Sequence, residues 1–267
     1  SGAVELRERA AGWCRTRGLE HWAAPAGDTA ALIAELPATD ALVVLGGDGT
    51  FLRAARAVAE VDVPIIGVNL GKVGFLSKAE AHQLESVLGR VVGGEYRIDE
   101  RMTVQAEILP AGRPATGEPF VALNDVVVAR GSLARVVRLD VEIGGSHLAT
   151  FIADGLVVAT PTGSTGYSFS AGGPILDPVS RNLVVTPIAG YLSAIRSVVA
   201  SPRQTVRCRV VDAHEALLSI DGREDRPLAV GDVVEVRALE RPIRFIEPDG
   251  GLPFWDLLRQ KVELLPS

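Results

Sequence analysis

The sequence ALVVLGGDGT, residues 41–50, decides the fold of the first part of the chain. Its first five residues are all apolar, which is typical of a strand buried on both faces of a parallel sheet. A glycine-rich turn follows, and residues 50–60 have a helical pattern. An apolar run at 64–68 and a helical pattern at 79–92 repeat this order. Alternating strands and helices predict a Rossmann-like, doubly wound α/β domain.

Two helices are expected before this first strand. Residues 3–18 carry apolar side chains among exposed Glu and Arg, and residues 28–36 form a second helical segment with Asp28 or Thr29 as its N-cap. A doubly wound domain usually opens with a strand, whereas this sequence opens with a helix. We therefore expect that residues preceding Ser1 are missing from the sequence.

The pattern changes near residue 99, where short β-branched segments separated by turns replace the strand–helix alternation. The expected strands are 102–109, 120–129, 136–143, 147–152, 156–159, 183–186, 205–211, 233–238 and 242–247. They predict a C-terminal β-rich, sandwich-like domain. A last helix at 253–261 has an apolar face, which we expect to pack back on the first domain. The predicted domains are 1–99 with about 248–267, and 100–247.

The composition excludes several classes of protein. Of 267 residues, 47% are hydrophobic and 22% are charged, which is ordinary for a globular protein. The net charge of −6 provides no basic surface for nucleic acid or for an anionic membrane. No apolar run reaches the roughly 20 residues that span a bilayer, and no signal peptide is evident. Two cysteines and four scattered histidines form no metal-ligand cluster, so we expect a cytoplasmic protein with no metal held by its side chains alone.

The glycine-rich turn has the features of a phosphate site. Gly46, Gly47, Gly49 and Thr50 lie where a strand ends and a helix begins, so free backbone N–H groups and the helix dipole favour an anion. The carboxylate of Asp48 would repel a phosphate unless it binds a metal, contacts a hydroxyl or accepts a proton. The alternative is that Asp48 only caps the helix.

Two familiar nucleotide-binding motifs are excluded. Residues 67–73 resemble a P-loop but are one residue short and lack the Ser or Thr after the lysine. The first domain also lacks a G-x-G-x-x-G motif with a downstream acidic residue, so a redox use of NAD has no support.

The second half contains a dense run of hydroxyl side chains at residues 154–168, DGLVVATPTGSTGYS. Such a loop can hydrogen-bond ribose and phosphate oxygens, and Tyr167 can stack on a base. The alternative is an ordinary Ser/Thr/Gly turn that begins a helix. Asn124 and Asp125, between apolar strand residues, add another polar point, which alone is more often a bulge or turn.

Together these motifs resemble the NAD kinase family. The matching stretches are GGDGT at 46–50, N-x-G-x-x-G-F-L at 69–76, Asn124-Asp125, the run at 154–167 and TPIA at 186–189. The resemblance extends from residue 40 onward, in the family's order. The GGDGT sequence alone is shared with diacylglycerol and sphingosine kinases, whereas the TPTGST run is far more specific.

The resemblance implies a role for each matching residue. Asp48 corresponds to the catalytic base for the 2′-hydroxyl of the adenosine ribose of NAD, in an active site at the domain interface. Gly46, Gly47, Gly49 and Thr50 correspond to the phosphate-donor loop. The implied substrate-binding residues are Gly49, Arg53 near the phosphates, Asn124 and Asp125 on ribose, Arg135, Ile152, Asp154 on the nicotinamide side, Thr162, Thr165, Gly166, Tyr167, Ser168, Phe169, Ser170 and Ala189.

The implied reaction uses ATP or polyphosphate with a divalent ion, usually Mg²⁺, in a homodimer or homotetramer. The sequence departs from the family at Asp125, where Glu is commoner, at Gly166, where Ala is usual, and at Gly190-Tyr191, where Pro-His is frequent. The alternatives are a lipid kinase that shares the glycine loop, a nucleotide-binding regulator without catalysis, and an NADP phosphatase. The polar 160–170 loop argues against a lipid kinase, and the intact Asp48 argues against a silent regulator.

Overall fold

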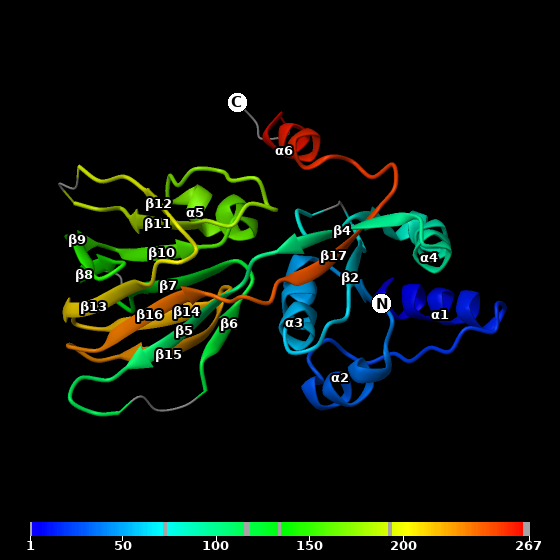
Figure 1. Cartoon of the computed structure of the whole chain (residues 1–267), viewed down its shortest axis with the longest axis horizontal. Helices are drawn as coiled ribbons and strands as arrows, with labels where there is room; N and C mark the ends of the chain where they lie inside the picture. The colour runs from blue at the N-terminus through cyan, green and yellow to red at the C-terminus, as the bar shows by residue number, and fades with distance from the viewer. Residues whose placement is uncertain (1, 72–73, 115–117, 133–134, 192–193, 264–267) are drawn as a thin grey trace. The chain divides into compact units, whose positions relative to one another are not determined.

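The computed structural model describes residues 2–71, 74–114, 118–132, 135–191 and 194–263. Two compact units make up the chain (Figure 1). The first unit contains Ser1–Glu100 and Ile243–Ser267, and the second contains Arg101–Pro242.

The first unit is an α/β unit with a mainly parallel sheet. Its sheet has the order β1-β2-β17-β4, and β3 pairs with the end of β2. The strands are β1 (Leu42–Leu45), β2 (Ile65–Asn69), β3 (Ala79–Glu80), β4 (Tyr96–Arg101) and β17 (Ile243–Pro248). The helices are α1 (Gly2–Arg15), α2 (Thr29–Glu35), α3 (Asp48–Val58), α4 (Leu84–Gly93) and α6 (Phe254–Glu263), with 3-10 turns η1 (Leu36–Ala38) and η2 (Ala81–Gln83).

Strand β2 is buried on both of its faces, as its apolar sequence predicts. Ile66 and Val68 belong to the core that α1 and α4 cover. Gly67 points the other way, and a Cβ there would lie 2.8 Å from the ring of Phe51 in α3. Alternate residues therefore face helices on opposite sides of the sheet, which confirms the three-layer α/β arrangement.

The predicted helix at 28–36 is confirmed as α2, and Asp28 is its N-cap because its side chain accepts a hydrogen bond from the N–H of Ala31. The predicted helix at 79–92 is wrong in its first turn. Residues 79–80 pair with β2 as a short strand, and a capping box between Glu80 and Gln83 forms a 3-10 turn before α4 begins.

The C-terminal helix α6 packs on the first unit, as expected. The ring of Phe254 lies 6.3 Å from that of Phe75, and the Lys261 ammonium lies 5.2 Å from the centre of the same Phe75 ring. Leu257 of α6 is buried.

The second unit contains two antiparallel six-stranded sheets in its described residues. One has the order β12-β11-β10-β7-β14-β15 and the other β6-β5-β16-β13-β8-β9. The strands are β5 (Val104–Leu109), β6 (Phe120–Ala122), β7 (Asp125–Arg130), β8 (Val137–Ile143), β9 (Ser146–Ala153), β10 (Gly155–Ala159), β11 (Leu183–Ile188), β12 (Val198–Ala200), β13 (Val206–Asp212), β14 (Ala216–Ile220), β15 (Arg223–Leu228) and β16 (Val233–Ala238). Inward residues of both sheets, such as Val128 and Leu139, form one large core, so the unit is a β-sandwich.

Three strand predictions need correction. The expected strand at 120–129 is two strands, because Leu123 and Asn124 leave the ladder between β6 and β7. Strands β12, β14 and β15 are missing from the prediction. The segment predicted at 242–247 does not continue the antiparallel pattern, because β17 pairs in parallel with β2.

The β7–β10–β11 sheet also has an apolar outer face. Val127, Val157, Ala159 and Val184 form a small core there, away from the sandwich interior. After β10 the chain forms the 3-10 turn η3 (Thr162–Thr165) and the short helix α5 (Tyr167–Ser170). The outer face of this sheet carries the cavity described next.

Candidate active site

The glycine-rich turn places Asp48 at the first position of α3. The N-cap residue is Gly47, which has no side chain with which to cap the helix. The alternative in which Asp48 caps a helix that starts at Thr50 is therefore wrong. The start of this 11-residue helix carries the positive end of the helix dipole.

The carboxylate of Asp48 is only partly satisfied. Its Oδ2 atom accepts a hydrogen bond from the backbone N–H of Phe75 at 3.3 Å. Its Oδ1 atom is buried and has no hydrogen-bond partner among the described residues. Gly74 makes this position possible, because a Cβ at residue 74 would lie 2.1 Å from Oδ1. One carboxylate oxygen thus remains available to a proton or a ligand.

The loop that holds Gly74 is fixed by side chains at the end of β2. Ser77 Oγ accepts the N–H of Gly74 at 2.9 Å and the amide of Asn69 at 3.3 Å. Asn69 Oδ1 in turn accepts the N–H of Gly71 at 3.0 Å. The N-x-G-x-x-G-F-L motif therefore positions the backbone beside Asp48, although its residues 72–73 lie outside the described residues.

Gly46 and Gly47 of the turn differ in whether the fold requires a glycine there. A Cβ at Gly46 would lie 2.8 Å from the side chain of Thr50, so the fold itself requires glycine there. A Cβ at Gly47 would meet nothing within 4 Å, and its φ of −85° suits any residue. Arg53, one turn further along α3, is exposed.

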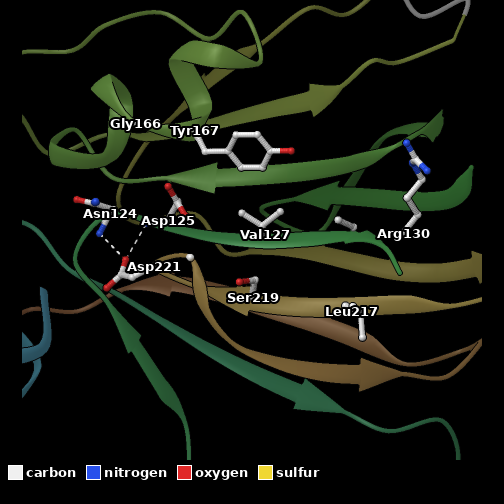
Figure 2. Close-up of a pocket in the computed structure, with 11 residues that line it drawn as sticks. Asn124, Asp125, Val127, Arg130, Gly166, Tyr167, Leu217, Ser219 and Asp221 are labelled. Carbon is white, nitrogen blue, oxygen red and sulfur yellow. Dashed lines mark hydrogen bonds between the residues drawn. The ribbon is translucent and has the colours of Figure 1, made fainter. Parts of the chain in front are cut away.

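A second group of polar residues lines a cavity of about 430 Å³ in the second unit. The residues of β7 that face it alternate along the strand, as the pleat requires: Asp125, Val127 and Ala129. Figure 2 shows Tyr167 of α5 on one side of the cavity and residues of β14 on the other. The lining is Asn124, Asp125, Val127, Ala129, Arg130, Gly166, Tyr167, Leu217, Ser219, Asp221 and Gly222. Its volume is in the range of small-molecule sites.

Two carboxylates lie close together at one end of this cavity. Asp221 accepts backbone hydrogen bonds from Leu123, Asn124 and Asp125. Asp125 is buried, and burial, reinforced by the charge of Asp221, raises the pKa of Asp125 to about 7. Asn124 Oδ1 is buried without a hydrogen-bond partner among the described residues. The cavity thus offers one unused acceptor and one acid that titrates near neutral pH.

Most hydroxyls of the 160–170 run serve the fold of the loop. Thr160 Oγ1 donates to the carbonyl of Leu123 at 2.5 Å, and Ser164 Oγ accepts the N–H of Leu176 at 3.0 Å. Ser168 Oγ lies 3.3 Å from Thr186 Oγ1. The interpretation as an ordinary turn is therefore correct for these three side chains. Thr162 Oγ1 differs, because it is buried without a partner among the described residues.

The remaining predicted site residues have varied positions. Gly166 and Tyr167 line the cavity, and Tyr167 is 47% exposed. Asp154 does not line it but forms an ion pair of 2.7 Å with Arg130, which does. Thr162, Thr165, Ser168, Phe169, Ser170, Arg135, Ile152 and Ala189 are outside the lining set. Of these, Arg135 is exposed, Ile152 accepts the N–H of Tyr191, and Ala189 has φ of 47°.

Sequence reasoning missed seven lining residues: Val127, Ala129, Arg130, Leu217, Ser219, Asp221 and Gly222. A signal for the last two was present. Asp-Gly between two apolar runs is the usual turn of a β-hairpin, and both residues have positive φ in the β14–β15 turn. Arg130 had no such signal, because its role follows from its pairing with Asp154.

The described residues contain no group of three or more His, Cys, Asp or Glu side chains suited to a metal ion. Among the same residues, none of the helices has the length and apolar character needed to span a membrane.

Family sequence models match both parts of the chain. Residues 3–96 match the ATP-NAD kinase N-terminal domain, and residues 123–248 match the ATP-NAD kinase C-terminal domain. An NAD kinase of Heliobacterium modesticaldum is 38% identical over 98% of this chain and 94% of its own length. One of Symbiobacterium thermophilum is 42% identical over 84% of this chain and 78% of its own length.

Two solved structures are also similar. An NAD kinase from Archaeoglobus fulgidus in complex with ATP has a TM-score of 0.78 and 26% identity, covering 100% of this chain and 96% of its own. Yeast NADH kinase complexed with NADH has a TM-score of 0.76 and 30% identity, covering 85% of this chain and 66% of its own. With family matches over most of its length and relatives of this identity, the chain belongs to the NAD kinase family of phosphotransferases.

Proposed function

We propose that this chain transfers the γ-phosphoryl group of ATP to the 2′-hydroxyl of the adenosine ribose of NAD, giving NADP, with Asp48 as general base. The observation that supports this proposal is that Asp48 Oδ1, at the start of α3, is buried and has no hydrogen-bond partner within the described part of the chain. A buried acceptor without a donor is costly, so its presence beside a phosphate site points to a proton or ligand that it receives.

The donor loop is proposed at Gly46, Gly47, Gly49 and Thr50. Gly47 supports it, because neither its φ nor any neighbouring atom explains why a side chain is absent. A glycine with open space around it suits close approach of a ligand to the backbone. The N-terminus of α3 supplies the favourable dipole for donor phosphates.

The divalent ion, which we propose is Mg²⁺, fits a site shared between substrate and protein. Mg²⁺ in kinases is held mainly by phosphate oxygens and waters, with one or two carboxylates. The substrate phosphates and waters would therefore supply most of its ligands. Once bound, such an ion neutralises charge on the transferring phosphoryl group.

The acceptor nucleoside is proposed to bind in the second unit's cavity. The Asn124 and Asp125 side chains offer acceptors for ribose hydroxyls, and the exposed ring of Tyr167 offers a stacking surface. Arg130 and Asp154, joined as an ion pair, define the far polar end of this cavity. The family-implied contacts of Arg53, Arg135, Ile152, Thr162, Thr165 to Ser170 and Ala189 remain proposals.

In the proposed step the 2′-oxygen forms a bond to the γ-phosphorus while the bond to the bridging oxygen breaks and ADP leaves. Asp48 accepts the hydroxyl proton, since a neutral ribose hydroxyl is a weak nucleophile.

The test is Asp48→Asn, assayed by NADP formation from NAD and ATP. We expect kcat to fall about 10²-fold or more while NAD affinity by calorimetry stays within a factor of two or so, because only the base is lost. Asp40→Asn is the matched control, because Asp40 is an exposed carboxylate just before β1, the strand that leads to the Asp48 turn. A kcat close to wild type in Asp48→Asn would reject Asp48 as the base.

Donor and acceptor choice are tested in the same assay. ATP is replaced by polyphosphate, and NAD by NADH or diacylglycerol. Product from diacylglycerol but not from NAD would favour the lipid-kinase alternative. Gly47→Ala is expected to raise KM for the donor without lowering the melting temperature. An unchanged donor KM would reject the proposed close approach at residue 47.

A further inference from the structure

Asp221 lies in the tight turn between β14 and β15, at one end of the cavity (Figure 2). It is only 6% exposed and has φ of 51°, a left-handed conformation that is uncommon for a residue other than glycine. The adjoining Gly222 also has positive φ, so the turn has the geometry of a tight hairpin.

The Asp221 carboxylate holds a short segment of backbone that belongs to other strands. Its Oδ1 accepts the N–H of Asn124 at 2.8 Å and that of Asp125 at 3.1 Å, and its Oδ2 accepts the N–H of Leu123 at 3.1 Å. The N–H of Asp221 donates to the carbonyl of Asp125 at 2.9 Å. Charge-assisted bonds to N–H groups are about twice as strong as neutral ones, so this contact fixes three consecutive residues.

The same segment is held from its other side by the hydroxyl loop. The carbonyl of Asn124 accepts the N–H of Thr160 at 2.9 Å. Gly163 packs so closely that a Cβ there would lie 2.0 Å from the Asn124 carbonyl oxygen. The backbone of Asn124 is thus fully engaged, while its side-chain Oδ1 stays unpartnered among the described residues.

We propose that Asp221 is a positioning residue for nucleoside binding, holding the Leu123–Asn124–Asp125 backbone so that the Asn124 and Asp125 side chains face the cavity. This rests on the proposed function, in which that cavity receives the ribose of NAD. Asp221 acts through the backbone of its neighbours, and its own carboxylate oxygens are occupied by their N–H groups.

The charge of Asp221 gives its positioning role a measurable effect on the pH dependence of NAD binding, which a purely structural role would not have. Burial, and then the neighbouring Asp221 charge, raises the pKa of Asp125 to about 7. Among the described residues that line the cavity, the other ionisable side chains are Tyr167 of α5 and Arg130, which is paired with Asp154. Since a carboxylate accepts hydrogen bonds from hydroxyls better than a carboxylic acid, NAD affinity should rise as pH increases through about 7.

The experiment compares Asp221→Asn with Asp232→Asn in the full chain. Asp232 is a matched control, because it is also 6% exposed and its carboxylate also accepts backbone N–H bonds, two of them, from Ala111 and Ala229, yet it does not line the cavity. Asp221→Asn places an amide N–H against backbone N–H groups. We expect its KM for NAD to rise about tenfold, with kcat at saturating NAD changed far less. Asp232→Asn is expected to lower the melting temperature and leave KM for NAD unchanged.

Two further readouts separate positioning from folding. Asp221→Asn should move the pH midpoint of NAD affinity below that of the wild type, because the like charge beside Asp125 is removed. Asp221→Glu keeps the charge but displaces the segment by a methylene, so it should raise KM and leave the pH midpoint in place. It also serves as the test if Asp221→Asn does not fold.

The outcomes distinguish this proposal from the proposed function. If Asn124→Ala leaves NAD affinity unchanged, the cavity is not the nucleoside site and both proposals fail. If Asn124→Ala weakens binding but Asp221→Asn and Asp221→Glu change KM no more than Asp232→Asn does, the nucleoside site stands and the positioning role of Asp221 is rejected.

Discussion

Asp48 and Asp221 are both acids set beside glycine-containing turns, yet their hydrogen bonding is opposite. Asp221 accepts three backbone N–H bonds of 2.8 to 3.1 Å. Asp48 accepts one N–H at 3.3 Å, and its other oxygen has no partner among the described residues. Hydrogen bonds to a carboxylate stabilise its charged form. A carboxylate whose oxygens all accept hydrogen bonds is therefore a poor base, but it holds the donating backbone firmly. The number of N–H partners therefore distinguishes Asp48, the proposed general base, from Asp221, the proposed positioning residue.

The largest expected effect comes from displacing the carboxylate of Asp48. Gly74→Ala places a Cβ where Asp48 Oδ1 now lies, 2.1 Å away, so the carboxylate has to move. Because a displacement of about 1 Å can cost 10²-fold in rate, we expect kcat for NADP formation to fall about 10²-fold. Gly71→Ala, in the same loop with nothing within 4 Å, is the control. Equal kcat values for the two variants would contradict the role given to the Asp48 position.

The next largest effect is expected from displacing the Leu123–Asn124–Asp125 backbone that Asp221 holds. Gly163→Ala drives a Cβ against the Asn124 carbonyl, at 2.0 Å. Overpacking against backbone costs roughly 1–3 kcal/mol, so we expect KM for NAD to rise about tenfold. Steady-state kinetics at saturating ATP would measure this rise. If kcat fell and KM did not, the clash would be acting on the chemical step instead of on the nucleoside site.

A smaller effect is expected on the pH dependence of stability. The folded-state pKa of Asp125 is about 7, above its unfolded value of about 3.9, so the folded protein binds the proton more tightly. The resulting stabilisation is fully present below about pH 4 and is lost as pH rises to about 7. Between pH 5 and 8 we expect the melting temperature of the ligand-free wild type to fall relative to Asp125→Asn, by roughly 2–4 °C or more. Parallel curves for the two proteins would mean that Asp125 is already ionised at pH 5.

The smallest effect is expected from helix α6. Phe254 lies against Phe75, whose N–H contacts Asp48, so Phe254→Ala loosens the support of the acid without removing a contact to it. We expect a fall of about two- to threefold in kcat, within the range of modest misplacement. Leu252→Ala, at an exposed position before α6, is the control. Identical kcat for wild type and Phe254→Ala would separate α6 from the Asp48 site.

The features that sequence reasoning predicted are those that local chemistry determines. The wholly apolar run before Gly46 predicted a strand followed by a helix, and β1 with α3 confirms that order. Its predicted burial on both faces is wrong, because β1 lies at the end of the strand order and only Val44 in it is buried. Asp28 was predicted as an N-cap because its side chain and the following N–H are neighbours in sequence. The match of GGDGT with the later motifs was likewise readable without a structure.

The features that it missed depend on contacts between distant segments. Asp221 acts on residues almost 100 positions earlier, so its Asp-Gly sequence indicates a hairpin turn but not the backbone segment that it holds. Residues 79–80 form a short strand because they pair with β2, whereas their own sequence suits the start of a helix. The hydroxyls of Thr160, Ser164 and Ser168 suggested ligand contacts, since their partners in the fold were unknown.

The pairing of β17 with β2 has a consequence for how the polypeptide is made. Phe245 completes the sheet beside Ile65, so the strand that β2 needs leaves the ribosome only after the whole sandwich has been synthesised. At elongation rates of roughly 5–20 residues per second, that delay is on the order of ten seconds. In the described residues, the strands of the sandwich pair with one another, so the sandwich can fold during that time, before the sheet next to Asp48 receives β17. A chain terminated before Ile243 would therefore lack a central strand of the first unit's sheet while keeping a foldable sandwich.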